Sequence, residues 1–270
     1  MNILELSLFI TNISYETNNW INKVFENNKL NGLNYDFLNL KTVDFVYKNR
    51  NNIEIYINEK IDLVLPNICV TKLDNYLFIS FCGIRNNKDL MCALDFLLKY
   101  DPVIDCSIHN GIYKSFYNII DEVKLIIDIH KKLDYKIIIT GHSFGASFAK
   151  LTCLYLSKVF EEEYMCIAFA SPITGDNTFA NQFNKYVSKS VNLCDPEDFI
   201  GNIPFTRYCA EKSKYMIQDK KLVPYKLCNR KYLLNLINYK YPTHKLSYFY
   251  EKIIIDDIDI SCLKINEMLE

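Results

Sequence analysis

The sequence predicts a single α/β domain over residues 1–270, with a mostly parallel central sheet and helices on both faces. Its strand-like segments are apolar throughout, which is typical of strands buried on both faces. They alternate with helix-like segments, as parallel strands joined by crossover helices require. Half of the 270 residues are hydrophobic and 23% are charged, so the chain has enough apolar material for one large core.

The alternation is clear from residue 75 onward. The expected strands cover 75–83, 135–140, 164–171 and 190–194. The expected helices cover 89–100, 115–133, 146–159 and 178–187, where apolar residues recur at the spacing of one helix face. Residues 1–70 and 205–240 give only weak signals, and we expect helix and irregular structure there.

Net charge and hydropathy narrow the classes of function. The 31 basic and 32 acidic side chains are spread without long blocks of one sign, which gives no electrostatic reason to expect nucleic acid as a partner. No apolar run approaches the roughly 20 residues of a membrane-spanning helix. The first residues, MNILELSLFITNISYE, have no basic residue before the apolar stretch and no small-residue cleavage site after it, so we expect no signal peptide.

The ten cysteines are scattered along the chain and form no CxxC pair. In a chain without an export signal, such cysteines are more often small buried hydrophobic residues than disulfides or metal ligands. We therefore expect a cytoplasmic location, and neither a metal nor another cofactor.

A Gly-x-Ser-x-Gly pattern stands between an expected strand and an expected helix, in IIITGHSFGASFAK (137–150). Loops at the carboxyl ends of parallel strands form the binding edge of such a sheet. A serine at this junction occupies a sharp turn, and small residues at 141 and 145 let the strand and the helix approach each other. Ser143 is therefore the candidate nucleophile, although a serine at this place can also merely cap the helix.

A serine nucleophile needs a base, normally a histidine oriented by a carboxylate. The chain has four histidines, at 109, 130, 142 and 244, and three of them precede Ser143. Because the order along the chain in this architecture is serine, acid, histidine, His244 is the candidate base.

The acid must lie between Ser143 and His244 and at the same edge of the sheet. The three glutamates at 161–163 follow a helix that carries the chain about 20 Å away from that edge. Asp176 resembles a helix cap, and Asp219 stands in a segment without a clear expected structure. Asp195 and Asp198 directly follow the strand SVNLC, and these residues alone leave both open.

Five segments, in order, resemble the class 3 lipase family, the fungal-type triacylglycerol lipases of the α/β-hydrolase fold. They are FISFCGI, IHNGIYKSF, ITGHSFGASFAKL, AFASPITGD, and NLCDPEDFIGNIP followed by HKLSYF. The resemblance implies an α/β-hydrolase fold and a lipase or esterase that uses a Ser-His-Asp triad. In the family, an apolar residue and a proline follow the acid two and six positions later. Ile200 and Pro204 stand at those places relative to Asp198, so the resemblance favours Asp198, with Asp195 as the alternative acid.

Three residues depart from the family pattern: Cys82 replaces an arginine, Ile84 a threonine or serine, and Ala146 a glycine. The resemblance implies an oxyanion hole made of the N–H groups of Ile84 and Phe144, in which Ile84 contributes only its backbone. It also implies a mobile lid over residues 85–100. A helix docked permanently on the core would have the same apolar stripe, so both interpretations stay open.

The leading expectation is therefore a serine hydrolase with a lipid or ester substrate and peripheral contact with a membrane or lipid droplet. A lipase-like binding or signalling protein without turnover is the alternative, and acyl transfer to another alcohol would use the same residues. Triglycerides, phospholipids and small esters all stay open as substrates, as does the oligomeric state.

Overall fold

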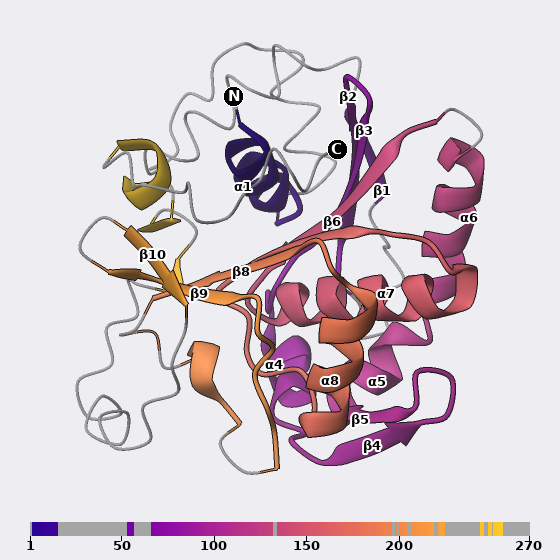
Figure 1. Ribbon diagram of the computed structural model, residues 1–270, viewed down its shortest axis with the longest axis vertical. Coiled ribbons are helices and arrows are strands. Elements are labelled where there is room, and N and C mark those ends of the chain that lie inside the picture. The colour runs from indigo at the N-terminus through magenta and orange to yellow at the C-terminus, as the bar shows by residue number, and fades with distance from the viewer. Residues whose placement is uncertain are drawn as a thin grey trace.

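A computed structural model of the chain (Figure 1) describes residues 2–15, 53–56, 66–131, 134–195, 198, 200–204, 207–218, 221–224, 244–245, 248–249 and 251–255. Within these residues, eight strands form one sheet in the order β1-β2-β3-β6-β7-β8-β9-β10. The strands are β1 Ile53–Tyr56, β2 Ile68–Leu73, β3 Tyr76–Phe81, β6 Lys136–His142, β7 Met165–Phe169, β8 Ser190–Cys194, β9 Lys214–Gln218 and β10 Lys221–Pro224.

The centre of this sheet is parallel and its two sides are antiparallel. The strands from β3 through β6, β7 and β8 to β9 pair in parallel, with Phe81 opposite Gly141 and Gly141 opposite Ala168. The pairs β1–β2, β2–β3 and β9–β10 are antiparallel. The parallel strands therefore end at one common edge, where the binding loops of such sheets lie.

Helices cover both faces of the sheet (Figure 1). The helix α1 (Ile3–Ile13) packs on one face, and α5 (Asn110–Phe116), α6 (Ile120–Lys131), α7 (Phe144–Phe160) and α8 (Asn177–Tyr186) pack on the other. Successive strand residues point to opposite faces, so Phe78 lies in the core under α1 whereas Leu77 and Ile79 lie in the core under the other helices. Two buried faces explain why the strands are apolar throughout.

The α/β prediction is confirmed, but two predicted helices have the wrong bounds. The helix expected over 89–100 is only α4 (Asn87–Ala93), and residues 98–101 form β4 (Leu98–Asp101), which pairs with β5 (Cys106–His109). The helix expected over 115–133 is the end of α5 followed by α6. In both places, apolar residues keep helical spacing across an irregular segment. In the first, Leu94 and Leu97 belong to that spacing but are exposed instead of packed in the core.

The weakly predicted segments contain more regular structure than the sequence indicated. Residues 1–70 include α1, β1 and the start of β2, and residues 205–240 include β9 and β10. The helix α1 begins with a capping box, in which the Asn2 side chain accepts from the Glu5 N–H and the Glu5 carboxylate accepts from the Asn2 N–H. The single-domain organisation over 1–270 stays a prediction.

Eight of the cysteines lie in the described part of the chain, where they are free thiols, and six of these are buried. This agrees with their predicted role as small hydrophobic residues, while Cys228 and Cys262 fall outside the described residues. In the same part of the chain, no helix is both long and apolar enough to cross a membrane.

Candidate active site

Ser143 occupies a strained turn between β6 and α7. Its backbone has φ 55° and ψ −128°, a conformation that is uncommon for any residue with a Cβ. The helix α7 begins directly against the end of β3, and this close approach requires a glycine at position 145. A methyl group on Gly145 would lie 2.3 Å from the Phe81 carbonyl oxygen and 2.4 Å from that of Cys82. The Ser143 N–H donates to the carbonyl oxygen of Phe169 at 2.9 Å, which fixes the turn to the neighbouring strand.

The ring of His244 lies between Ser143 and a carboxylate. Its Nε2 is 2.8 Å from Ser143 Oγ, and its Nδ1 is 2.8 Å from Asp198 Oδ2. An ionised carboxylate can only accept, so Nδ1 carries the proton and donates it to Asp198, which leaves Nε2 to accept from the serine hydroxyl. All three residues are buried, so these contacts lie in a medium of low dielectric constant, where charge interactions are strong.

The two candidate acids have different partners. Asp198 is fully buried, and its second oxygen, Oδ1, accepts the N–H of Ile200 at 2.9 Å. Asp195 is also buried, but its Oδ2 accepts from the hydroxyl of Tyr248. The backbone joins the two, because the Asp198 N–H donates to the Asp195 carbonyl oxygen at 3.1 Å. The structure thus brings Asp198 to His244 and turns Asp195 toward Tyr248.

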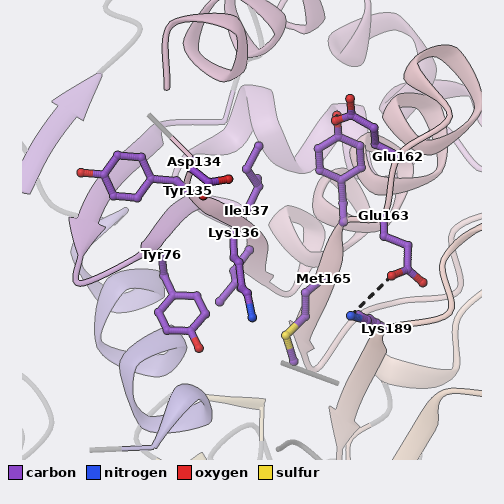
Figure 2. A pocket seen from close by; sticks show the side chains of 11 residues that line it. Tyr76, Asp134, Tyr135, Lys136, Ile137, Glu162, Glu163, Met165 and Lys189 are labelled. Carbon is purple, nitrogen blue, oxygen red and sulfur yellow. Dashed lines mark hydrogen bonds and ion pairs between the residues drawn. The ribbon is translucent and has the colours of Figure 1, made fainter. Parts of the chain in front are cut away.

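The other acidic candidates do not reach the histidine. Asp176 caps α8, where its side chain accepts from the Phe179 N–H, and Asp219 lies outside the described residues. Glu162 and Glu163 line a cavity of about 340 Å³ at the opposite edge of the sheet, together with Tyr76, Lys136 and Lys189 among others (Figure 2). That cavity lies where β3, β6 and β7 begin, whereas Ser143 follows the end of β6.

Ile84 and Phe144, the predicted oxyanion donors, lie on either side of the turn that carries Ser143. Phe144 is the first residue of α7, a position whose N–H has no partner inside the helix. The strand end before Ile84 approaches the turn closely, since a methyl group on Gly83 would lie 3.1 Å from Ser143 Cβ and 2.9 Å from the His142 carbonyl oxygen.

Two residues that the sequence did not single out support the site. His142 Nε2 lies 2.6 Å from the backbone oxygen of His244, and its Nδ1 lies 2.7 Å from the hydroxyl of Tyr15, at the end of α1. The carbonyl only accepts, so Nε2 donates to it and Nδ1 accepts from Tyr15. Burial, together with the nearby His244 ring, lowers the pKa of His142 from 6.5 to about 3. His142 is therefore a neutral clamp that holds the backbone of His244.

An exposed apolar surface lies beside Phe144. It comprises Leu90, Met91, Leu94, Phe96 and Leu97, which are all more than one-third exposed. The buried ring of His109 joins this segment to the site, because it lies 5.6 Å from the Phe96 ring and 5.8 Å from the Phe144 ring, centroid to centroid. The predicted lid segment, 85–100, contains α4, the irregular residues 94–97 and the start of β4.

Known proteins resemble the chain in this region. The model of the class 3 lipase family matches residues 78–208. A secreted mono- and diacylglycerol lipase of Fusarium solani is 24% identical over 131 residues, which are 47% of this chain and 39% of the relative. A lipase of Rhizomucor miehei is 30% identical over 112 residues, or 39% of this chain and 31% of the relative. The chain thus spans well under half the length of the curated relatives it matches.

Solved lipase structures share the fold. A Yarrowia lipolytica lipase superposes with a TM-score of 0.61 at 19% identity, covering 88% of this chain and 90% of the other. A Rhizomucor miehei lipase bound to its propeptide gives a TM-score of 0.60 at 20% identity, covering 80% of this chain and 68% of the other. The fold is therefore that of the α/β-hydrolase lipases, as predicted.

The cytoplasmic location expected from the sequence is wrong. It conflicts with the names of the relatives from Fusarium solani and Malassezia restricta, which describe secreted lipases; the latter is 34% identical over 80 residues, covering 28% of this chain and 27% of the relative. The expectation depended on the scattered cysteines and on the expected lack of a signal peptide and of a membrane-spanning segment. The structure shows why the cysteines are a poor guide. Most of the described thiols are buried among apolar side chains, so packing accounts for them whatever the redox state of the surroundings.

Proposed function

We propose, from the premise that residues 78–208 belong to the class 3 lipase family, that this chain is a serine hydrolase that cleaves carboxylic ester bonds of lipids. The observation that supports this best is the double contact of His244, whose two ring nitrogens lie 2.8 Å from Ser143 Oγ and 2.8 Å from Asp198 Oδ2. This arrangement allows a hydroxyl to be deprotonated at neutral pH while the charge formed on the ring stays paired.

In the first half of the reaction, Ser143 Oγ attacks the carbonyl carbon of the ester. His244 Nε2 takes the hydroxyl proton as the C–O bond forms, and Asp198 stabilises the resulting imidazolium and holds its orientation. The carbonyl oxygen becomes an oxyanion, toward which the N–H groups of Ile84 and Phe144 donate. Collapse of this intermediate expels the alcohol, which receives the proton from His244, and leaves an acyl group on Ser143.

In the second half, water attacks the acyl-enzyme. His244 accepts a proton from the water, the same N–H groups stabilise the second oxyanion, and the acid product leaves as Ser143 regains its proton. Another alcohol in place of water would give acyl transfer through the same steps. No bound group is needed for this chemistry, because the base, the acid and the oxyanion donors all come from the chain.

The exposed apolar side chains of α4 and the residues after it support a lipid as the acyl donor. Leu90, Met91, Leu94 and Leu97 are between 43% and 71% exposed, and apolar surface of this kind favours contact with hydrocarbon. The names of the matched relatives point to glycerol esters of fatty acids. We propose peripheral contact of this surface with a lipid aggregate during turnover.

A fluorophosphonate probe tests the proposal without knowledge of the natural substrate. We expect the full chain to be labelled on Ser143, as located by peptide mass spectrometry, and a panel of a triglyceride, a phospholipid and a short p-nitrophenyl ester to yield free acid from at least one member. The matched control is Ser147→Ala, which removes a buried serine from α7, the helix that follows Ser143. A chain that is folded but unlabelled and inactive on the panel would instead be a lipase-like binding protein.

A further inference from the structure

Two lysines are buried beneath the loop that carries Asp198. Lys214, the first residue of β9, is 2% exposed, and Lys150, on α7, is 1% exposed. A buried ammonium group is costly unless it has charged or hydrogen-bonding partners. The partners of each lysine therefore indicate what it does.

Lys150 belongs to a buried ion pair. Its Nζ lies 2.9 Å from Glu211 Oε1 and donates to the carbonyl oxygen of Pro172 at 3.2 Å. Both side chains are 1% exposed. The pair joins α7 to the segment before β9, so its role is explained by packing of the scaffold.

Lys214 instead reaches the turn that holds the candidate acid. Its Nζ donates to the carbonyl oxygen of Gly201, in the short 3-10 turn Ile200–Asn202. The N–H of Ile200, in the same turn, donates to Asp198 Oδ1 at 2.9 Å. Lys214 and Asp198 therefore both bond to the backbone of this one turn, and Asp198 in turn accepts from His244.

The ammonium group and the carboxylate also face the same small space. A methyl group on Gly201 would lie 3.9 Å from Asp198 Oδ2 and 3.9 Å from Lys214 Nζ. Burial lowers the pKa of Lys214, as does Lys150, while Cys194, Glu211 and the carboxylate of Asp198 raise it. The charged groups around Asp198 therefore include a buried cation that β9 supplies.

We propose that Lys214 is a positioning residue for the acid of the catalytic triad. It fixes the turn that orients Asp198, and its positive charge favours the ionised carboxylate that His244 requires. This inference deepens the proposed function and rests on it. Lys214 touches neither the substrate nor the reacting atoms, so its effect passes through Asp198 and should be lost when Asp198 is lost.

The test compares Lys214→Met with the wild-type chain on a p-nitrophenyl ester and a fluorophosphonate probe. We expect kcat to fall about ten- to a hundred-fold with KM within about twofold, a part of the roughly ten-thousand-fold loss expected without the acid. We also expect the acid limb of the pH profile of kcat/KM to move to higher pH. Removing a nearby cation stabilises the protonated forms of both Asp198 and His244.

Two comparisons separate this role from simple support of the fold. In an Asp198→Asn background, Lys214→Met should lower kcat by less than about twofold further, because the group through which it acts is already lost. The matched control is the double variant Lys150→Met with Glu211→Leu, which removes the buried ion pair between these two residues. It should alter stability but leave the acid limb of the pH profile in place. An acid limb that moves equally in the control, or a full further loss of kcat in the Asp198→Asn background, contradicts the proposal.

Folding itself gives a second readout if Lys214→Met is unstable. If the two charges compensate each other, Asp198→Asn should restore part of the loss, with a coupling of at least about tenfold in the unfolding equilibrium constant measured in urea. If the stability losses of the two single variants simply add in the double variant, the inference is contradicted. A wild-type chain that is not labelled at Ser143 refutes the proposed function itself, whereas normal labelling of both wild type and Lys214→Met refutes only the role of Lys214.

Discussion

The two edges of the central sheet carry polar side chains of similar kinds in different surroundings. At the carboxyl edge, Ser143, Asp198 and His244 are all at most 8% exposed and are joined by hydrogen bonds. At the opposite edge, Lys189 and Glu163 form an ion pair at 3.4 Å with side chains 28% and 60% exposed (Figure 2). The first edge buries its charge and the second leaves it in water.

The difference shows that composition alone does not make a reactive site. An exposed ion pair is screened by solvent and contributes about 0–1 kcal/mol to stability. A buried carboxylate beside a histidine has no such screening, so its interaction with the neighbouring ring is strong. What distinguishes the carboxyl edge is the convergence of segments far apart in the sequence over a strained serine, which removes water from the groups that react.

The largest effect should follow from removing Ser143, the proposed nucleophile, at the buried edge. Ser143→Ala should lower turnover by roughly a million-fold while the fold stays intact, and His244→Ala should be similarly inactive. Initial rates on a p-nitrophenyl ester, with circular dichroism as the check of folding, measure this. Activity within tenfold of wild type in either variant would place the chemistry elsewhere.

The next effect separates the two aspartates of the same loop. Asp198→Asn should lower turnover about ten-thousand-fold, because His244 would lose the acceptor that fixes its tautomer. Asp195→Asn should cost less than about tenfold, since its carboxylate accepts from Tyr248 and does not reach the ring. If the two variants rank in the reverse order in kcat, Asp195 is the acid.

His142 should make the stability of the buried edge depend on pH. Its pKa in the folded chain, about 3, lies below the ordinary 6.5, so the unfolded chain binds the extra proton first. The contribution of neutral His142 to the free energy of unfolding is complete above pH 6.5 and is lost as the pH falls toward 3. Between pH 7 and pH 4.5, wild type should lose roughly 2–3 kcal/mol more than His142→Gln in urea unfolding. Equal losses would mean that His142 titrates normally.

The smallest effect is expected at the opposite edge. Lys189→Met removes the cation of the exposed pair with Glu163 and should change stability by less than about 1 kcal/mol. Ester hydrolysis should stay within about twofold of wild type, measured with the assay used for Ser143→Ala. A large loss of turnover in Lys189→Met would mean that the exposed edge also takes part in the reaction.

Much of the fold could be predicted because its signals are local. An apolar strand, a glycine-flanked serine and an amphipathic helix each occupy a few adjacent residues. The ends of β6, α7, β7, α8 and β8 all lie within two residues of their predicted bounds. The predicted helix over 89–100 failed because its apolar residues serve an exposed surface instead of the core. Local spacing does not tell these two uses apart.

The candidate site could be predicted only as far as chain order and the family resemblance reached. Ser143 and His244 followed from a turn pattern and from the scarcity of histidine. Tyr15 and Lys214 had no signal, because each reaches the site from a segment outside the recognised motifs. Tyr15 contacts His142, 127 positions away, and Lys214 contacts Gly201, 13 positions away. Such contacts depend on the packing of α1 and β9, which no short motif encodes.

The contact between Ser143 and His244 joins residues that are 101 positions apart in the sequence. During synthesis at about 5–20 residues per second, this separation amounts to roughly 5–20 seconds in which the elbow can form without its base. A nascent chain therefore has no candidate base beside Ser143 until residue 244 has been made and has docked. Under the proposed mechanism, the order of the chain itself thereby delays the onset of activity.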